Sequence, residues 1–134
     1  MRIVWKHMPL AIHPDAPAAH QASVAASKQG KFWEFHDKLF SDQRNLKPDA
    51  FRKYAQELGL NMEQFEKDQL GADNQRLIDA DMAEARNLGV TGTPGFFVNG
   101  RFLSGAKPFA EFANVINAEL ARLNLPVPPG ARAE

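Results

Sequence analysis

The sequence feature that most restricts the fold is the dipeptide Asn99-Gly100, which lies between two short apolar runs. Asparagine and glycine both tolerate the positive φ angles that a two-residue hairpin turn requires. The flanking residues, 95–98 and 101–103, include three phenylalanines and a valine, which favour strands. The sequence therefore predicts an antiparallel hairpin near the end of the chain.

The start of the chain predicts one further strand. Ile3, Val4 and Trp5 form a short β-prone run. The dipeptide Met8-Pro9 closes this run, because proline cannot donate to a ladder of backbone hydrogen bonds. We therefore expect a strand over residues 2–7.

Between these strands the apolar residues follow helical spacing. Phe32, Phe35, Leu39 and Phe40 are predicted to share one face of a helix, and glycines such as Gly59 mark helix ends. Helices are expected to begin near Pro17, Phe32, Pro48, Asn61 and Asp73, with a sixth near Pro108. The rings of Phe32, Trp33, Phe35 and Phe40 are expected in the core rather than in a ligand site.

The order of elements is strand, several helices, hairpin and helix, which indicates an α/β fold. A length of 134 residues favours a single domain, expected over residues 1–125, with a helical insertion over about 14–88. Residues 126–134 are rich in Pro, Gly and Ala and predict a flexible tail.

Composition excludes several classes of function. Sixteen basic and sixteen acidic residues cancel, so no net field would attract nucleic acid or an anionic membrane. No apolar run reaches the length of a membrane span, and the first residues lack the pattern of a signal peptide. As written, the chain is expected to stay in the cytoplasm.

The chain contains no cysteine, which excludes a disulfide, a thiolate nucleophile and a cysteine-ligated metal. Four histidines, His7, His13, His20 and His36, show no metal-binding spacing and are interpreted as solvated or core-edge residues. No metal site and no cofactor are predicted. Asp81 is expected to turn inward on its helix, whereas the other helical carboxylates are assigned to solvent.

Several blocks resemble the DsbA-like group of thioredoxin-fold disulfide oxidoreductases. Residues 3–10 resemble the second core strand of that family, and residues 29–40 resemble its helical insertion. Residues 89–100 resemble its most recognisable stretch, and the closing hairpin and helix match as well. The resemblance covers residues 2–123 and implies an incomplete thioredoxin-like fold with a helical insertion before the C-terminal hairpin.

This resemblance implies a site for substrate peptides at Gly92, Thr93 and Pro94. In the family, Thr93-Pro94 would carry a cis peptide bond, and the backbone before the proline would pair with an extended peptide. A simpler interpretation is that Pro94 only begins a strand, where its missing N–H does no harm.

The chain departs from the family at the reacting groups. A core strand and a helix that carries Cys-x-x-Cys in its first turn would lie before Met1. No catalytic residue is therefore assigned, and the chain by itself is expected to be inactive in thiol–disulfide exchange. If an upstream segment has been lost, the native protein would be a disulfide oxidoreductase of the periplasm or another exported location.

The missing strand would leave sheet edges unpaired, and three outcomes follow. Either a second copy covers the gap, or the first strand shifts toward the hairpin, or another polypeptide supplies the strand. We favour a homodimer. The alternative function is a non-catalytic peptide-binding or assembly module that uses the groove beside Pro94, and a glutathione-dependent relative is a third possibility.

Overall fold

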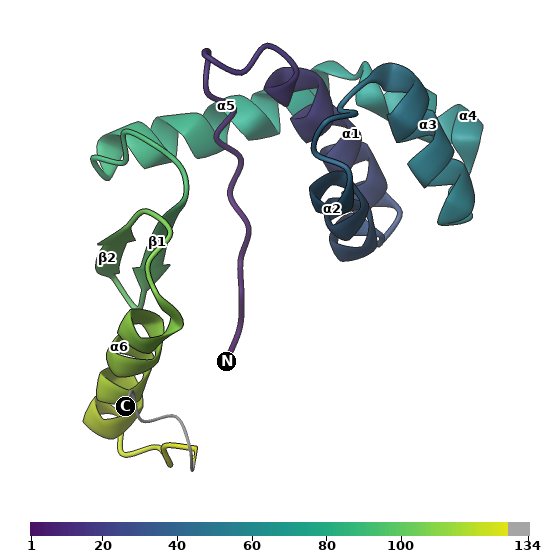
Figure 1. Cartoon of the computed structure of the whole chain (residues 1–134). Coiled ribbons are helices and arrows are strands. Elements are labelled where there is room, and N and C mark those ends of the chain that lie inside the picture. Colours follow the sequence, from purple (N-terminus) through teal and green to yellow (C-terminus); the bar gives the residue numbers. More distant parts are fainter. Residues whose placement is uncertain (129–134) are drawn as a thin grey trace. The chain divides into compact units, whose positions relative to one another are not determined.

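The computed structural model describes residues 1–128. The elements are α1 (Ala16–Lys28), α2 (Phe32–Ser41), α3 (Pro48–Glu57), α4 (Met62–Gln69), α5 (Ala72–Asn87), β1 (Gly95–Val98), β2 (Arg101–Ser104) and α6 (Phe109–Arg122) (Figure 1). They form two compact units, a helical unit over Met1–Asn87 and a hairpin unit that begins at Leu88.

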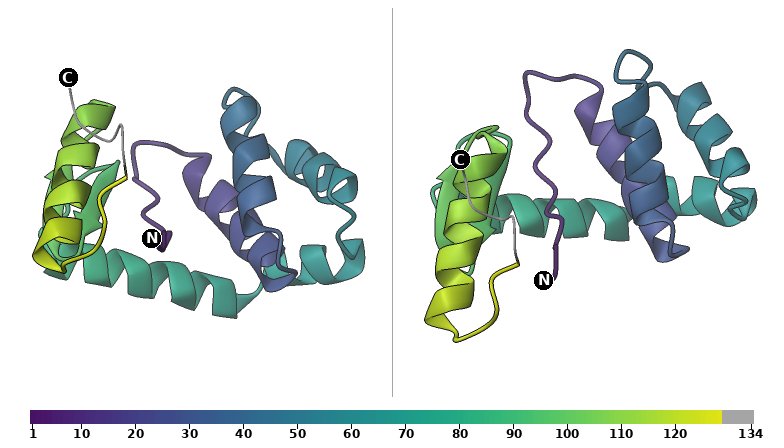
Figure 2. Two further views of the ribbon diagram at one scale, coloured as in Figure 1. Left: turned by 90° about the horizontal axis from the view of Figure 1, so that it is seen from below. Right: turned by 60° about the horizontal axis from the view of Figure 1, so that its bottom comes forward.

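The core of the helical unit lies where α1 meets α2, α3 and α4. Helix α1 contributes Ala22, Ala25 and Ala26, which are fully buried. Because alanine is small, neighbouring helices approach this face closely and place large rings against it. Two of these rings, Phe35 of α2 and Phe65 of α4, have no exposed surface, and their centroids lie 5.8 Å apart. Figure 2 shows α1 to α4 side by side in both views.

Local signals place the helix ends close to the predicted positions. The side chain of Asn61 accepts a hydrogen bond from the backbone N–H of Gln64 at 3.0 Å, so Asn61 caps α4. Gly59 follows α3 with a φ of +69°, a conformation that costs glycine little. The predicted succession of helices is therefore confirmed.

The prediction of a strand over residues 2–7 is wrong. These residues form no regular element, and within the described chain no backbone–backbone hydrogen bond involves them. A strand exists only when a neighbour completes its ladder, and β1 and β2 are paired with each other. The run therefore has the propensity for a strand but no partner, and Ile3 and Val4 remain 67% and 59% exposed.

Helix α2 also differs from expectation in what it buries. Phe35 lies in the core as predicted, whereas Trp33 and Phe40 are 45% and 55% exposed. A helix in contact with its neighbours along one stripe covers only the residues on that stripe, and the opposite rings remain at the surface. The prediction that these four rings lie in the core therefore holds for Phe35 and fails for Trp33 and Phe40.

The hairpin unit confirms the predicted turn and strands. Gly95 pairs with Ser104, and Val98 pairs with Arg101, in antiparallel register. Asn99 and Gly100 have φ angles of 48° and 85°, as a tight hairpin turn requires. Helix α6 lies against β1, where the rings of Phe96 and Phe112 meet at 4.7 Å in an edge-to-face arrangement. Of the predicted tail, residues 129–134 lie outside the described chain.

Candidate functional site

Gly92, Thr93 and Pro94 form the exposed segment that leads into β1. The peptide bond between Thr93 and Pro94 is cis. The carbonyl of Pro94 accepts a hydrogen bond of 2.8 Å from the N–H of Gly105, just after β2, which extends the contact between the two strands. The hairpin therefore fixes one side of this segment, and its other side is open to solvent.

The sheet offers backbone groups along its free edges. In the described residues β1 pairs with β2 only, so one edge of each strand has no partner strand. Such an edge presents N–H and C=O groups at the spacing that an added strand needs. The candidate site is thus an edge that continues from the segment 92–94 into β1.

The two faces of the hairpin differ in what covers them. Phe96 contacts α6, whereas Phe97 and Phe102 stand opposite each other in the ladder, with ring centroids 4.9 Å apart. Residues directly opposite in a ladder share a face, so these two rings form an apolar pair. Both remain exposed by about two-fifths, at 42% and 44%. An extended ligand beside β1 would therefore meet both backbone and aromatic surface.

Gly95 has little free space around its Cα. A Cβ built there would lie 3.1 Å from Cγ1 of Val90 and 3.4 Å from the ring of Phe102. Any larger residue would push the Phe102 ring or the buried Val90 away from the first residue of β1. The glycine thus allows the hairpin to close over Val90, a packing role that the sequence alone did not identify.

This site has no group that can exchange disulfides. The full sequence contains no cysteine, and the side chains of Gly92, Thr93 and Pro94 offer one hydroxyl and no group that ionises near neutral pH. What the site can do chemically is bind an extended backbone and an apolar side chain.

A second cluster of functional groups lies at the start of the chain. Lys6 contacts two carboxylates of α5, Asp81 Oδ1 at 2.9 Å and Glu84 Oε2 at 2.8 Å. These contacts, Glu84 first, raise the pKa of Lys6 above its ordinary value. The backbone N–H of His7 donates to Asp81 Oδ2 at 2.9 Å. Asp81 is buried, as predicted, and it fastens residues 6 and 7 to α5.

The same segment inserts an aromatic ring between residues of α2. The Trp5 ring lies 5.7 Å from Phe32, 6.4 Å from Trp33, 4.9 Å from His36 and 6.4 Å from Phe40. A cavity of ≈ 490 Å³ beside it is lined by the first residues of the chain and by Phe32, Trp33 and Leu77. The exposed rings of α2 therefore pack against Trp5. Helical spacing could not reveal this contact, because Trp5 lies far from α2 in the sequence.

The histidines are not equivalent. His7 and His20 face each other, with their Nδ1 atoms 2.8 Å apart. Burial lowers the pKa of His7. It also lowers the pKa of His20 to about 4, and the nearby His7 acts in the same direction. The sequence did not suggest this pair, because the two residues lie 13 positions apart with three prolines, Pro9, Pro14 and Pro17, between them.

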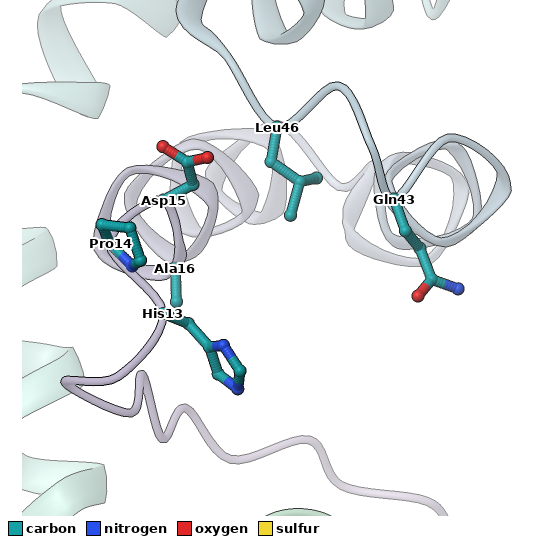
Figure 3. A pocket seen from close by; sticks show the side chains of 6 residues that line it. All are labelled: His13, Pro14, Asp15, Ala16, Gln43 and Leu46. Carbon is teal, nitrogen blue, oxygen red and sulfur yellow. The ribbon is translucent and has the colours of Figure 1, made fainter.

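A further opening of ≈ 350 Å³ lies between the start of α1 and the connection from α2 to α3 (Figure 3). Its charged carboxylate, Asp15, is already bound by the ammonium of Lys47 at 2.8 Å. Its polar groups do not converge on a common point in Figure 3, so it is a weak candidate for a ligand site.

Comparison with known proteins decides the family. The family described as DSBA-like thioredoxin domain matches residues 1–117. The chain belongs to this family. The resemblance seen in the sequence is thereby confirmed, and the helical unit, hairpin and closing helix are those of an incomplete DsbA-like α/β fold.

The curated relatives of this DsbA-like chain are much longer proteins. One is named Na⁺/H⁺ antiporter NhaA 3, from Salinispora tropica; it is 41% identical over 102 residues, covering 75% of this chain and 16% of the relative. Na⁺/H⁺ antiporter NhaA 1 from Salinispora arenicola is 36% identical over 126 residues, covering 93% and 19%. A third, from Herminiimonas arsenicoxydans, is 40% identical over 106 residues, covering 79% and 17%. The chain thus spans less than a fifth of each of these relatives.

In the described part of the chain, the helices are all too short or too polar to cross a membrane. The longest, α5, has 16 residues and carries charged side chains along its length.

Proposed function

We propose that this chain is the peptide-binding part of a DsbA-like thiol–disulfide exchange domain and that it carries no redox activity by itself. The observation that supports this most directly is the exposed segment Gly92–Thr93–Pro94 running into a strand with a free edge. Membership of the DsbA-like family supplies the thiol–disulfide context. The absence of cysteine from all 134 residues means that both thiols would have to come from another polypeptide segment.

Binding is proposed to occur by strand addition. An extended polypeptide beside β1 would exchange backbone hydrogen bonds with the edge, which recognises no particular sequence. Phe97 and Phe102 would contact apolar side chains of the ligand. This combination suits an unfolded protein substrate, because an unfolded chain offers both free backbone groups and exposed apolar residues.

A titration with an unstructured, cysteine-free peptide rich in apolar residues tests this proposal. We expect amide chemical shifts to move for residues 92–98 when the peptide is added to ¹⁵N-labelled protein. The matched control is the same peptide N-methylated at alternate residues. Loss of two backbone hydrogen bonds at about 1 kcal/mol each should weaken binding roughly 25-fold.

The variant Thr93→Val separates backbone recognition from recognition by the hydroxyl. Valine keeps the shape of threonine, so the affinity for the peptide should stay within about twofold if the backbone carries binding. Equal affinity for the N-methylated and unmethylated peptides, or shifts confined to residues far from β1, would contradict strand addition.

Redox inactivity has its own test. In an insulin-reduction assay with excess dithiol, the chain should give no turnover above the dithiol alone, because it has no thiolate to attack a disulfide. Turnover by a sample whose mass shows no added thiol would refute this part of the proposal.

We also propose that a second copy of the chain covers the unpaired residues 2–7. The supporting observation is the run Ile3-Val4, which is exposed, prone to form a strand and without a backbone partner in the described chain. Such an edge is satisfied when a strand from another molecule is added to it, and a symmetric dimer is the commonest way to achieve this.

Light scattering at micromolar concentration should give the mass of a dimer. The variant Val4→Pro removes an N–H from the proposed ladder and should give a monomer, whereas Val4→Thr keeps a strand-forming residue and should remain dimeric. A monomeric wild type would exclude the dimer, and a dimeric Val4→Pro variant would show that the interface lies elsewhere.

A further inference from the structure

The start of the chain is fastened to the helical unit by a contact that two histidines share. His7, from the irregular segment, is 6% exposed, and its Nδ1 lies 2.8 Å from Nδ1 of His20 on α1. The two rings meet edge to face, with centroids 5.1 Å apart. No regular element holds residues 2–7. In the described chain they are positioned by this contact, by the hydrogen bond from the His7 backbone N–H to Asp81, and by the contacts of Lys6 and Trp5.

The geometry of the pair limits how many protons it can hold. Two Nδ1 atoms at hydrogen-bond distance need one hydrogen between them, with one ring as donor and the other as acceptor. When only one of the two rings is protonated, the Nδ1 atom of the other ring keeps its lone pair and still accepts the hydrogen bond. When both rings are imidazolium, both Nδ1 atoms carry hydrogen, and two positive charges face each other at 2.8 Å.

We propose that the His7–His20 pair is an acid-sensitive latch, which holds residues 2–7 against α1 and α5 at neutral pH and releases them when both imidazoles are protonated.

The charged groups around the His7–His20 pair permit one of the two imidazoles to be protonated and disfavour protonation of both. On the segment itself, Lys6 is positive and disfavours a charged His7; on α5, the carboxylate of Asp81 favours it. Asp81 already binds the Lys6 ammonium and the His7 backbone N–H, and Glu84 also binds Lys6. From α2, the neutral ring of Phe32 packs against His7 at 6.1 Å. Asp81 would therefore have to interact with the Lys6 ammonium, the backbone N–H of His7 and the charged ring of His7 at the same time.

The direction of the pH effect follows from the lowered pKa values. Burial lowers the pKa of His7, and it lowers that of His20 from 6.5 to about 4. A released histidine would titrate near 6.5, so below that pH the released state binds more protons than the latched state. Each unit of pH between 6.5 and 4 therefore shifts the equilibrium toward release by about tenfold for His20 alone. Above pH 6.5 both states are neutral, and the latch is unaffected.

Release would uncover a surface on α2. Trp5 leaves its contacts with Phe32, Trp33, His36 and Phe40 when the segment moves, and the exposed rings of α2 lose the ring that partly covers them. Indole fluorescence is a poor reporter of Trp5, because a second tryptophan, Trp33, lies 6.4 Å from it and emits in the same range. A distance measurement is therefore preferable.

The absence of cysteine makes such a measurement direct, because two introduced cysteines are the only labelling sites. We would place spin labels at Ile3→Cys on the segment and Ala80→Cys on α5, both exposed positions of the helical unit. With the labelled protein diluted into excess unlabelled protein, so that distances between copies do not contribute, double electron–electron resonance should give one narrow distance distribution at pH 7.5. At pH 4.5 the distribution should broaden, while circular dichroism at 222 nm shows that the helices remain.

Two variants in the labelled background identify the histidines responsible. His20→Gln keeps a side chain that can hydrogen-bond but never becomes charged, so the distribution should stay narrow at pH 4.5. His13→Gln changes an exposed histidine outside the pair and should broaden as the wild type does. Equal broadening in His20→Gln and wild type would overturn the proposal, as would a narrow wild-type distribution at pH 4.5.

The wild type alone also tests the latch if His20→Gln fails to fold. A two-dimensional NMR titration should show the Hε1 signals of His7 and His20 changing at lower pH than that of a short peptide containing the same residues. Loss of helical dichroism at the same pH as broadening would show global unfolding instead of local release, and it would refute the latch.

Discussion

A single buried carboxylate, Glu119, joins the hairpin turn to the last helix. Its Oε1 lies 2.8 Å from Nε of Arg101 on β2, and its Oε2 accepts from Arg122 at 2.9 Å. Asn99 of the turn also donates to it, at 3.4 Å. Only 4% of Glu119 is exposed, so the carboxylate depends on these partners instead of water.

The hairpin unit should therefore become less stable in acid. Arg122 first, and then Asn99 and Arg101, lower the pKa of Glu119 below its ordinary value of 4.5. A carboxyl whose pKa is lower in the folded state contributes its full stability above pH 4.5 and loses it as pH falls through the folded pKa. Protection factors of the β1 and β2 amides, corrected for the intrinsic exchange rate at each pH, should fall over that range.

The variant Glu119→Gln supplies the control, since glutamine does not titrate. We expect lower protection factors than in wild type at pH 7 and a flatter dependence of the protection factors on pH below 4.5. If wild type and Glu119→Gln depended on pH in the same way, Glu119 would not be the group responsible.

At the scale of one element, α2 presents two phenylalanines in opposite environments. Phe35 is fully buried against Tyr54 and Phe65, whereas Phe40 is 55% exposed beside Trp5. The same residue type on one helix thus allows a matched comparison of core packing with surface contact.

Replacing Phe35 by alanine should lower the free energy of unfolding by about 3–5 kcal/mol, because the ring leaves a cavity among the helices. Replacing Phe40 should cost roughly 1 kcal/mol, as for an exposed aromatic contact. Urea unfolding followed by circular dichroism measures both. Similar losses for the two variants would mean that the core is centred elsewhere than on Phe35.

At the scale of the whole molecule, the helical unit and the hairpin unit differ in how much apolar packing stabilises them. The helical unit has a continuous buried cluster that joins α1 to α4. The hairpin unit has two four-residue strands and one helix, and two-stranded sheets are marginal in water.

A fragment of residues 1–87 should therefore keep its helical dichroism and a cooperative thermal transition. A fragment of residues 88–134 should show no cooperative thermal transition, because so small a unit buries little apolar surface. A cooperative transition in the second fragment and none in the first would reverse this assignment of stability.

The sequence by itself determined the hairpin, the succession of helices and the DsbA-like family, because these depend on local spacing and on blocks of residues in order. Asn99-Gly100 requires its turn whatever surrounds it. The inward turn of Asp81 on its helix was also expected, and Asp81 is buried.

Only the tertiary structure decided the state of residues 2–7 and the pairing of His7 with His20. Strand propensity in Ile3-Val4-Trp5 has no effect without a neighbouring edge, and the chain turned these residues toward α2 and α5 instead. The histidine pair depends on how the segment that contains Pro9 and Pro14 returns to α1, which no spacing in the sequence specifies. Local chemistry determined the elements, and long-range packing determined which side chains meet.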